Sequence, residues 1–200
     1  MYNSSENRPQ PILKNREIKT LFYSGMLHEK FGVKELIEAF SLIENPNFRL
    51  RICGSGDYES ELKEIARRDN RIQILGLLNR EEVLKEQANA DLLVNPRTPA
   101  GDYTKYSFPS KTIEYLASGT PAIIHRLPGI PEEYYDYCFT FKSTQLYNIA
   151  EDIKNTLSRS PEEMQEIGTR AQNFIFREKN AVSQTAKIKD SITSIIYGNA

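Results

Sequence analysis

The sequence predicts an α/β fold in which about six strands form one parallel sheet with helices on both faces. Short apolar runs, most of them followed by turn residues, alternate with longer segments whose apolar residues recur at helical spacing. Strands that alternate with helices in this way pair in parallel through right-handed crossovers. The usual strand order for such a series is the doubly wound 3-2-1-4-5-6. We therefore expect a single Rossmann-like domain.

The expected strands are short runs rich in apolar and β-branched residues. They cover residues 20–24, 49–53, 72–75, 91–95, 122–125 and 138–141. Apolar residues at helical spacing predict helices between these strands and after the last one. The expected helices cover residues 33–43, 58–68, 81–88, 109–118, 144–158, 161–177 and 181–196. Asp57 is the expected N-cap of the second helix.

The chain is expected to have three parts. Residues 1–18 are polar and contain prolines, which is typical of a tail or a linker stub. Residues 19–180 hold the expected domain, and residues 181–197 form a separate terminal helix. That helix carries an apolar stripe, which consists of Val182, Ile188, Ile192, Ile195 and Ile196. A stripe without a partner favours either loose attachment of the helix or its burial in a homodimer.

Composition and charge argue against several classes of protein. The chain has 26 Lys and Arg against 27 Asp and Glu, and its net charge of −1 gives no reason to expect a nucleic-acid partner. Cys53 and Cys138 stand apart in apolar runs and are expected to be buried thiols. His28 and His125 lack the spacing of a metal site. The sequence shows neither a secretory leader nor an apolar run of about 20 residues, so we expect a soluble, cytoplasmic protein.

The most informative segment, residues 106–124, is a loop followed by a helix and a short buried strand. Pro109 suits the first helical turn, where its missing N–H is no loss. Gly119 can adopt the left-handed conformation that ends a helix, and Pro121 prevents continuation. On local pattern alone, an ordinary capped helix packed on a sheet remains an alternative to a binding site.

The start of this helix has the chemistry of an anion-binding site. The free N–H groups of Ser110, Lys111 and Thr112 are expected to point out of the helix, where its dipole favours negative charge. Lys111 adds a positive charge, and the carboxylate of Glu114 is placed to accept hydrogen bonds from sugar hydroxyls. The segment therefore predicts a site for a phosphorylated sugar or a nucleotide.

Two loops are expected to meet at this site. In the predicted strand order, the first and fourth strands are neighbours at the switch point, and ligands bind above their carboxyl ends. The loops that follow these strands are residues 25–32 and 96–109. Lys30 and the helix that starts near Pro109 would thus face the same crevice. This convergence favours a binding site over a merely structural helix.

An ordered series of motifs resembles the C-terminal, nucleotide-sugar-binding half of a retaining glycosyltransferase of group 1, or family 4, with the B-type fold of two Rossmann domains (GT-B). The motifs are KFGVKELIEAF (30–40), LRICGSG (50–56), IQILG (72–76), ADLLVNP (90–96), FPSKTIEYLASGTP (108–121) and PGIPE (128–132). No single motif is specific, but together they extend the resemblance over about residues 20–197.

The resemblance implies roles for individual residues. Lys30 and Glu114 match the family's catalytic-site positions, with Lys30 neutralising the donor diphosphate and Glu114 binding the ribose. A fixed cation beside the diphosphate stabilises the negative charge that builds as the leaving group departs. Leu77 and Leu78 match the loop whose backbone meets the base. The residues that match donor and phosphate contacts are Gly25, Lys30, Ser107, Phe108, Ser110, Lys111 and Thr112.

Two positions depart from the family pattern. Tyr106 stands where a glutamate usually orients the hydroxyls of the donor sugar, and a phenol carries no charge at neutral pH. Met26 stands where a diphosphate-binding arginine usually follows the first strand. Methionine cannot bind phosphate, so Lys111, or an arginine such as Arg97, would have to substitute.

The resemblance implies a donor-binding domain that moves a sugar, with retention, from a nucleotide diphosphate sugar to a glycan or lipid-linked acceptor. Synthesis of a bacterial surface polysaccharide is the expected setting, which allows a membrane-peripheral position for the full-length protein. The N-terminal Rossmann domain that carries the acceptor site in this family is missing from these 200 residues, so the chain alone is expected to be inactive. No metal or other cofactor is expected. Half of a sugar-nucleotide 2-epimerase, or a degenerate half that acts as a scaffold, remain alternatives.

Overall fold

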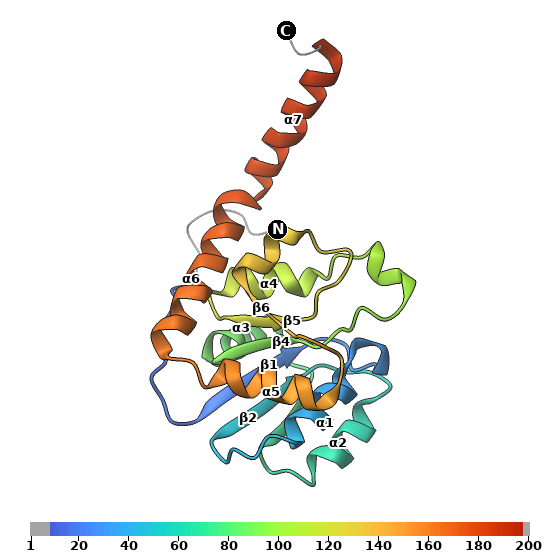
Figure 1. The fold of residues 1–200 in the computed structure, drawn as a ribbon, viewed down its shortest axis with the longest axis vertical. Helices are drawn as coiled ribbons and strands as arrows, with labels where there is room; N and C mark the ends of the chain where they lie inside the picture. Colours follow the sequence, from blue (N-terminus) through green and yellow to red (C-terminus); the bar gives the residue numbers. More distant parts are fainter. Residues whose placement is uncertain (1–8, 198–200) are drawn as a thin grey trace.

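The computed structural model describes residues 9–197, and its sheet has the predicted topology (Figure 1). All strand pairs are parallel, and the order is β3-β2-β1-β4-β5-β6. The strands are β1 (Lys19–Ser24), β2 (Phe48–Cys53), β3 (Ile72–Gly76), β4 (Leu92–Asn95), β5 (Ala122–Ile124) and β6 (Phe139–Thr140). The predicted fold class and strand order are therefore confirmed.

Helices cover both faces of the sheet. One face packs against α1 (Val33–Ser41), α2 (Glu59–Ala66) and α5 (Leu146–Leu157). The other packs against α3 (Arg80–Asn89), α4 (Ser110–Ser118) and α6 (Pro161–Glu178). The 3-10 turns η2 (Glu29–Phe31), η3 (Asp102–Lys105) and η4 (Glu132–Tyr137) lie in the connecting loops.

The two faces of the sheet form two hydrophobic cores. Along β1, Leu21 and Tyr23 belong to the core under α1, whereas Phe22 belongs to the core under α4. Successive side chains of a strand point to opposite faces, so a strand that is covered on both sides reads as a continuous apolar run. Cys53 and Cys138 are buried and unpaired, as predicted. Burial raises the pKa of the Cys138 thiol to about 12.

Two predicted helix starts are wrong in detail. Asp57 does not cap α2, because its carboxylate is paired with His28 Nδ1 at 2.5 Å and the residue before the helix is Tyr58. Pro109 is not the first helical residue of α4 but its N-cap, with an extended backbone. Gly119 does end α4 in the left-handed conformation, with φ of 81°, as expected.

Part of the predicted tail lies against the domain. The Nζ of Lys14 donates hydrogen bonds to the carbonyl of Ala90 and to Thr120 Oγ1, and Arg16 Nε lies 3.1 Å from Asp91 Oδ1. Burial lowers the pKa of Lys14 to about 8. Residues 9–18 therefore stabilise the amino edge of β4, and residues 1–8 lie outside the described range.

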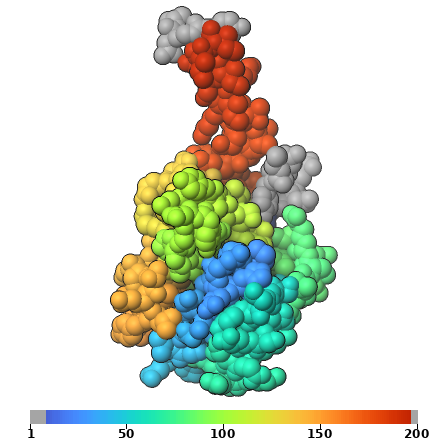
Figure 2. Space-filling model, turned by 90° about the vertical axis from the view of Figure 1, so that its right-hand side faces the viewer, coloured from blue at the N-terminus to red at the C-terminus, as the bar shows by residue number. Residues whose placement is uncertain are grey.

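The terminal helix α7 (Ala181–Tyr197) projects from the body of the domain, continuing beyond the end of α6 (Figures 1 and 2). The residues of its predicted apolar stripe are all exposed: Val182, Ile188, Ile192, Ile195 and Ile196. Within residues 9–197, none of the helices combines the length and the apolar character needed to cross a membrane.

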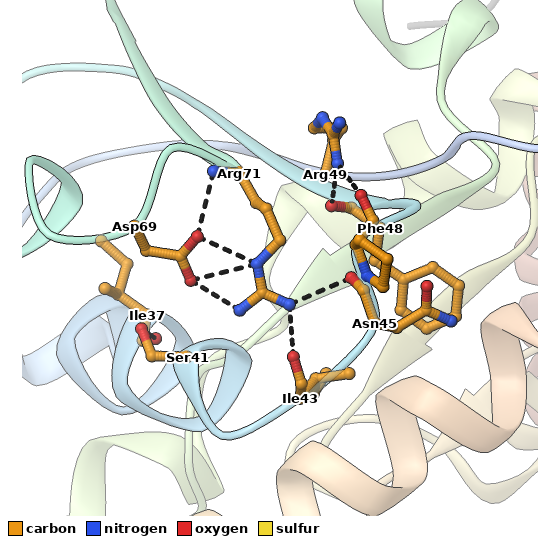
Figure 3. Close-up of polar contacts among 9 residues, drawn as sticks. Ile37, Ser41, Ile43, Asn45, Phe48, Arg49, Asp69 and Arg71 are labelled. Atoms are coloured by element: carbon orange, nitrogen blue, oxygen red, sulfur yellow. Dashed lines mark hydrogen bonds and ion pairs between the residues drawn. The ribbon is translucent and has the colours of Figure 1, made fainter.

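At the amino ends of β2 and β3, Arg71 joins two loops (Figure 3). Its guanidinium donates to both carboxylate oxygens of Asp69, with Nη2 2.6 Å from Oδ2. Its Nη1 donates to the carbonyl oxygens of Ile43 and Asn45. This arginine is thus fully engaged in holding the fold.

Candidate functional site

A cavity of about 320 Å³ opens at the carboxyl ends of β1 and β4, at the predicted switch point. It is lined by Tyr23, Ser24, Gly25, Met26, Phe31, Asn95, Arg97, Phe108, Pro109, Ser110, Lys111 and Tyr115. These residues come from the carboxyl ends of β1 and β4, from the loops that follow these strands, and from α4. The structure therefore brings together the two loops that the sequence predicted would meet.

Glycines allow these loops to approach so closely. Gly32 has φ of 77°, and a Cβ there would lie 2.2 Å from the carbonyl oxygen of Pro96. Gly54 has φ of 147°, and a Cβ there would lie 1.8 Å from the carbonyl oxygen of Gly25. A side chain at Gly32 would push apart the two loops that form the cavity wall, and one at Gly54 would push the loop after β1 away from the loop after β2.

The helix start at the cavity offers fewer free donors than predicted. The N–H of Thr112 donates to the carbonyl oxygen of Pro109 at 2.9 Å, which closes the first turn. The Thr112 side chain is only 1% exposed, and its Oγ1 is buried without a partner. The expectation of a free N–H group is therefore wrong for Thr112, and Ser110 and Lys111 remain as the amide donors at the cavity.

Lys111 joins this cavity to a second hollow. The second hollow, of about 300 Å³, lies between α3 and α4 and is lined by Arg80, Val83, Leu84, Lys111 and Glu114. Lys111 Nζ lies 2.8 Å from Glu114 Oε1. The two predicted site residues thus form an ion pair at the boundary between the two hollows.

Gln87 on α3 forms a hydrogen bond with Glu114 that the sequence did not predict. Its Nε2 donates to Glu114 Oε1 at 2.5 Å, and the Gln87 side chain is fully buried. Both Gln87 and Lys111 bond to Oε1, so among the described residues Oε2 of Glu114 has no partner. Nothing in the polar segment REEVLKEQAN marks Gln87 for this role, because the contact depends on how α3 packs against α4.

Tyr115 ties the start of α4 to the end of β1. Its hydroxyl accepts a hydrogen bond from the N–H of Ser24 at 2.9 Å and donates to the carbonyl oxygen of the same residue. Burial raises the pKa of the Tyr115 hydroxyl, so it stays protonated at neutral pH. Tyr115 therefore acts in positioning the helix start beside β1.

Arg97 and Lys30 lie on the side of the cavity formed by the loops. The Arg97 guanidinium carbon lies 5.4 Å from the ring centre of Phe31 and 4.7 Å from that of Tyr103. Lys30 is not among the residues that line the cavity; its Nζ lies 5.2 Å from the ring centre of Phe31, which does line it. The Tyr103 hydroxyl donates to the carbonyl oxygen of Lys30, which joins η3 to η2.

Three predicted site residues, Tyr106, Leu77 and Leu78, are not among the residues that line the cavity, whereas Phe108 is. Tyr106 is 90% exposed and Leu77 is 76% exposed, whereas Leu78 packs against the core under α4. Ser107 accepts a hydrogen bond on Oγ from Arg97 Nη2, and Phe108 on the cavity wall packs edge-on against another ring. The predicted contacts of Leu77, Leu78 and Tyr106 with a ligand stay predictions.

His125 is buried at the carboxyl end of β5. It is 4% exposed, and its ring centre lies 4.5 Å from that of Phe141. Burial lowers the pKa of His125 to about 4, an effect that the charge of Asp152 partly offsets. Among the described residues, no group of three His, Cys, Asp or Glu side chains is arranged to hold a metal ion.

Comparisons with known proteins agree with this architecture. Residues 4–174 match the family described as glycosyl transferases group 1. The amylovoran biosynthesis glycosyltransferase AmsK of Erwinia amylovora is 32% identical over 111 residues, which are 53% of this chain and 27% of that protein. The chain thus spans about a quarter of the length of this curated relative.

Solved structures of glycosyltransferases share the fold. The Anabaena protein Alr3699/HepE, solved in complex with UDP and glucose, has a TM-score of 0.69 at 19% identity, over 89% of this chain and 49% of that one. The C-terminal domain of the group 1 protein LpcC from Francisella tularensis has a TM-score of 0.67 at 19% identity, over 88% of this chain and 95% of that one. With the family match over residues 4–174, the chain belongs to the group 1 glycosyl transferases.

Proposed function

We propose that this domain binds the donor of a retaining sugar transfer, a nucleotide diphosphate sugar, across the two hollows that meet at Lys111. The observation that carries the proposal is the cavity at the switch point, which has Arg97, Lys111 and the start of α4 on its wall and no carboxylate among its lining residues. Fixed cations and helix N-terminal amides favour a phosphate group.

The second hollow fits the nucleoside end of the same ligand. Glu114 and Lys111 stand at its entrance, and Glu114 has an oxygen available to accept a ribose hydroxyl. The diphosphate would then lie beside Lys111 in the first cavity, with Lys30 neutralising the charge of the leaving group. The complex of HepE with UDP and glucose supports this class of ligand.

The acceptor would be a glycan or a lipid-linked sugar, bound by an N-terminal domain outside these 200 residues. This chain covers 49% of HepE, and AmsK takes part in amylovoran biosynthesis, which supports a two-domain enzyme of polysaccharide synthesis. The domain alone would bind donor and transfer nothing. Donor binding would need no metal ion, because Lys30, Lys111 and the helix start supply the positive charge.

The test is calorimetric titration of the chain with UDP, GDP, dTDP and ADP, first without metal and then with magnesium. We expect one nucleotide to bind saturably without metal and to bind at least about 10-fold more weakly to Lys30→Ala and Glu114→Gln. The exposed Lys189→Ala, on α7, is the matched control. A chain that binds none of the four, while its two-domain form binds one, would show that the site needs the second domain.

A scaffold role is the second candidate, because Met26 places an uncharged side chain on the cavity wall and Tyr106 points its phenol into solvent. Both residues replace charged groups that the family usually carries. If neither the chain nor the two-domain protein binds any of the four nucleotides, the result would favour this candidate.

A further inference from the structure

One arginine on the cavity wall is held in place but has no anionic partner among residues 9–197. Arg97 lies two residues after the end of β4, and its guanidinium lies against the rings of Phe31 and Tyr103. Its Nη2 donates to Ser107 Oγ at 3.1 Å. Tyr103 is itself fixed by its hydrogen bond to the backbone of Lys30. These contacts fix the position of the guanidinium but leave most of its donors unused.

The charge and the hydrogen-bonding capacity of Arg97 are not satisfied within the described residues. Ion pairs there engage other arginines, namely Arg16, Arg51, Arg67, Arg71, Arg126 and Arg159, but not Arg97. The Nε of Arg97 is buried and has no hydrogen-bond partner. The Nε is closed off from solvent, so a ligand in the cavity would bind through the two Nη groups, of which Nη2 already donates to Ser107 Oγ.

The ligand that suits this arrangement is a diphosphate. A guanidinium presents several N–H donors in a planar fork that matches the oxygens of a phosphate group. The cavity holds a second cation, Lys111, and the amides at the start of α4, so two linked phosphates can each find donors. Met26 lines the same cavity and offers none of these interactions.

We infer that Arg97, reaching in from the loop after β4, is the residue that binds the diphosphate of the donor, where Met26 leaves the loop after β1 without a cation. The inference rests on the proposed donor site and adds to it the residue that recognises the diphosphate. Arg97 then contacts the ligand directly, and Phe31 and Tyr103 position its guanidinium.

The experiment compares Arg97→Gln and Arg97→Lys with the unaltered chain. Each is titrated with the nucleoside diphosphate that binds best, with the corresponding nucleoside, and with inorganic pyrophosphate. We expect Arg97→Gln to bind the diphosphate and pyrophosphate about 10- to 100-fold more weakly while binding the nucleoside as before. Arg97→Lys keeps the charge but not the fork, and we expect an intermediate loss.

Controls separate recognition from folding. Arg68→Gln, at an exposed arginine beyond α2, should change none of these affinities. Thermal unfolding of each variant shows whether the domain is intact. Unchanged diphosphate affinity in Arg97→Gln would overturn the inference, and so would an equal loss for diphosphate and nucleoside, which indicates a structural role.

The pyrophosphate titration keeps this inference distinct from the proposed function. If the chain binds pyrophosphate but neither the chain nor its two-domain form binds a nucleotide, the proposed function fails. The Arg97→Gln variant then decides alone whether Arg97 forms the anion site, because only loss of pyrophosphate binding in that variant supports it.

Discussion

Arg71 lies on the side of the sheet where the parallel strands begin, its amino edge, and Arg97 lies on the side where they end, its carboxyl edge. The two arginines have opposite surroundings. Arg71, at the amino end of β3, is bonded to both oxygens of Asp69 and to two backbone carbonyls (Figure 3). Arg97, at the carboxyl end of β4, bonds to one hydroxyl and keeps a buried Nε without a partner. The first arginine closes loops that hold the fold, and the second leaves donors for a ligand.

The comparison shows that the size of a hollow does not identify the site. The hollow beside Arg71 has a volume of about 650 Å³, whereas the cavity beside Arg97 has about 320 Å³. The larger hollow contains Asp69, which already neutralises its arginine. What distinguishes the carboxyl edge is positive charge and hydrogen-bonding capacity that the described part of the chain does not satisfy.

The largest effect is expected at the amino edge. Arg71→Ala removes the partner of Asp69, whose side chain, like that of Arg71, is only 15% exposed. Breaking such a pair leaves a nearly buried carboxylate, and we expect the free energy of unfolding to fall by about 3 kcal/mol. Urea denaturation measures the loss, with the exposed Arg68→Ala as control.

The nucleotide affinity of Arg71→Ala should stay within about 2-fold of the unaltered value, which is less than 0.5 kcal/mol. A large loss of nucleotide affinity in Arg71→Ala without a loss of stability would contradict the contrast between the two edges.

His125 provides a second test of this contrast, because it is a polar residue that lies near the carboxyl edge but is buried in the protein. Its pKa is lowered to about 4 by burial, while an unfolded histidine titrates near 6.5. Between these values the unfolded chain takes up a proton and the folded chain does not, so stability falls as the pH drops from about 6.5 toward 4. We expect this loss to be of the order of 2 kcal/mol and to be absent in His125→Phe.

Urea denaturation at several pH values between 7 and 4 measures this difference. His28→Asn changes the only other histidine, which is paired with Asp57 outside the core, and should keep the acid sensitivity that depends on His125. An identical pH profile for His125→Phe and the unaltered protein would show that His125 is not the group responsible.

The smallest effect concerns Gln87, a buried residue that supports the site from α3. Gln87→Met keeps the shape of the side chain but removes the donor to Glu114, so we expect about 5- to 10-fold weaker binding of the nucleoside diphosphate. The loss should be specific to ligands with ribose hydroxyls, and a dideoxynucleoside diphosphate should bind both proteins equally.

A double-mutant cycle with Glu114→Gln tests the coupling of these residues. If Gln87 acts through Glu114, adding Gln87→Met to Glu114→Gln should weaken binding little further. Additive losses would show that the two residues act independently.

Most of the fold could be predicted from sequence because its signals are local. The strands show as apolar runs and α1 as apolar residues at helical spacing, and Gly119 marks the end of α4. The alternation of strands and helices then limits the sheet to few orders. The errors at Asp57 and Pro109 concern single residues at helix starts, where a nearby partner or one backbone angle changes the outcome.

The location of the candidate site was predicted from the sequence, but several of its contacts were not. The loops after β1 and β4 and the start of α4 were placed together by topology, and Gly25, Ser110 and Lys111 do line one cavity. Gln87 and the burial of His125 were not foreseen, because each depends on contacts between elements distant in the sequence.

Sequence signals were enough to predict the order of the elements, the buried faces and the end of the strands at which the cavity opens. Which polar groups there satisfy one another became visible only in the folded arrangement. Periodicity and turn chemistry act over a few residues, whereas the pairing of Arg71 and the unpaired state of Arg97 depend on which loops meet. Burial makes an unpaired donor costly wherever it stands, and Arg51 Nε is another example among the described residues, so the position of Arg97 on the cavity wall, and not the unpaired donor alone, favours ligand binding.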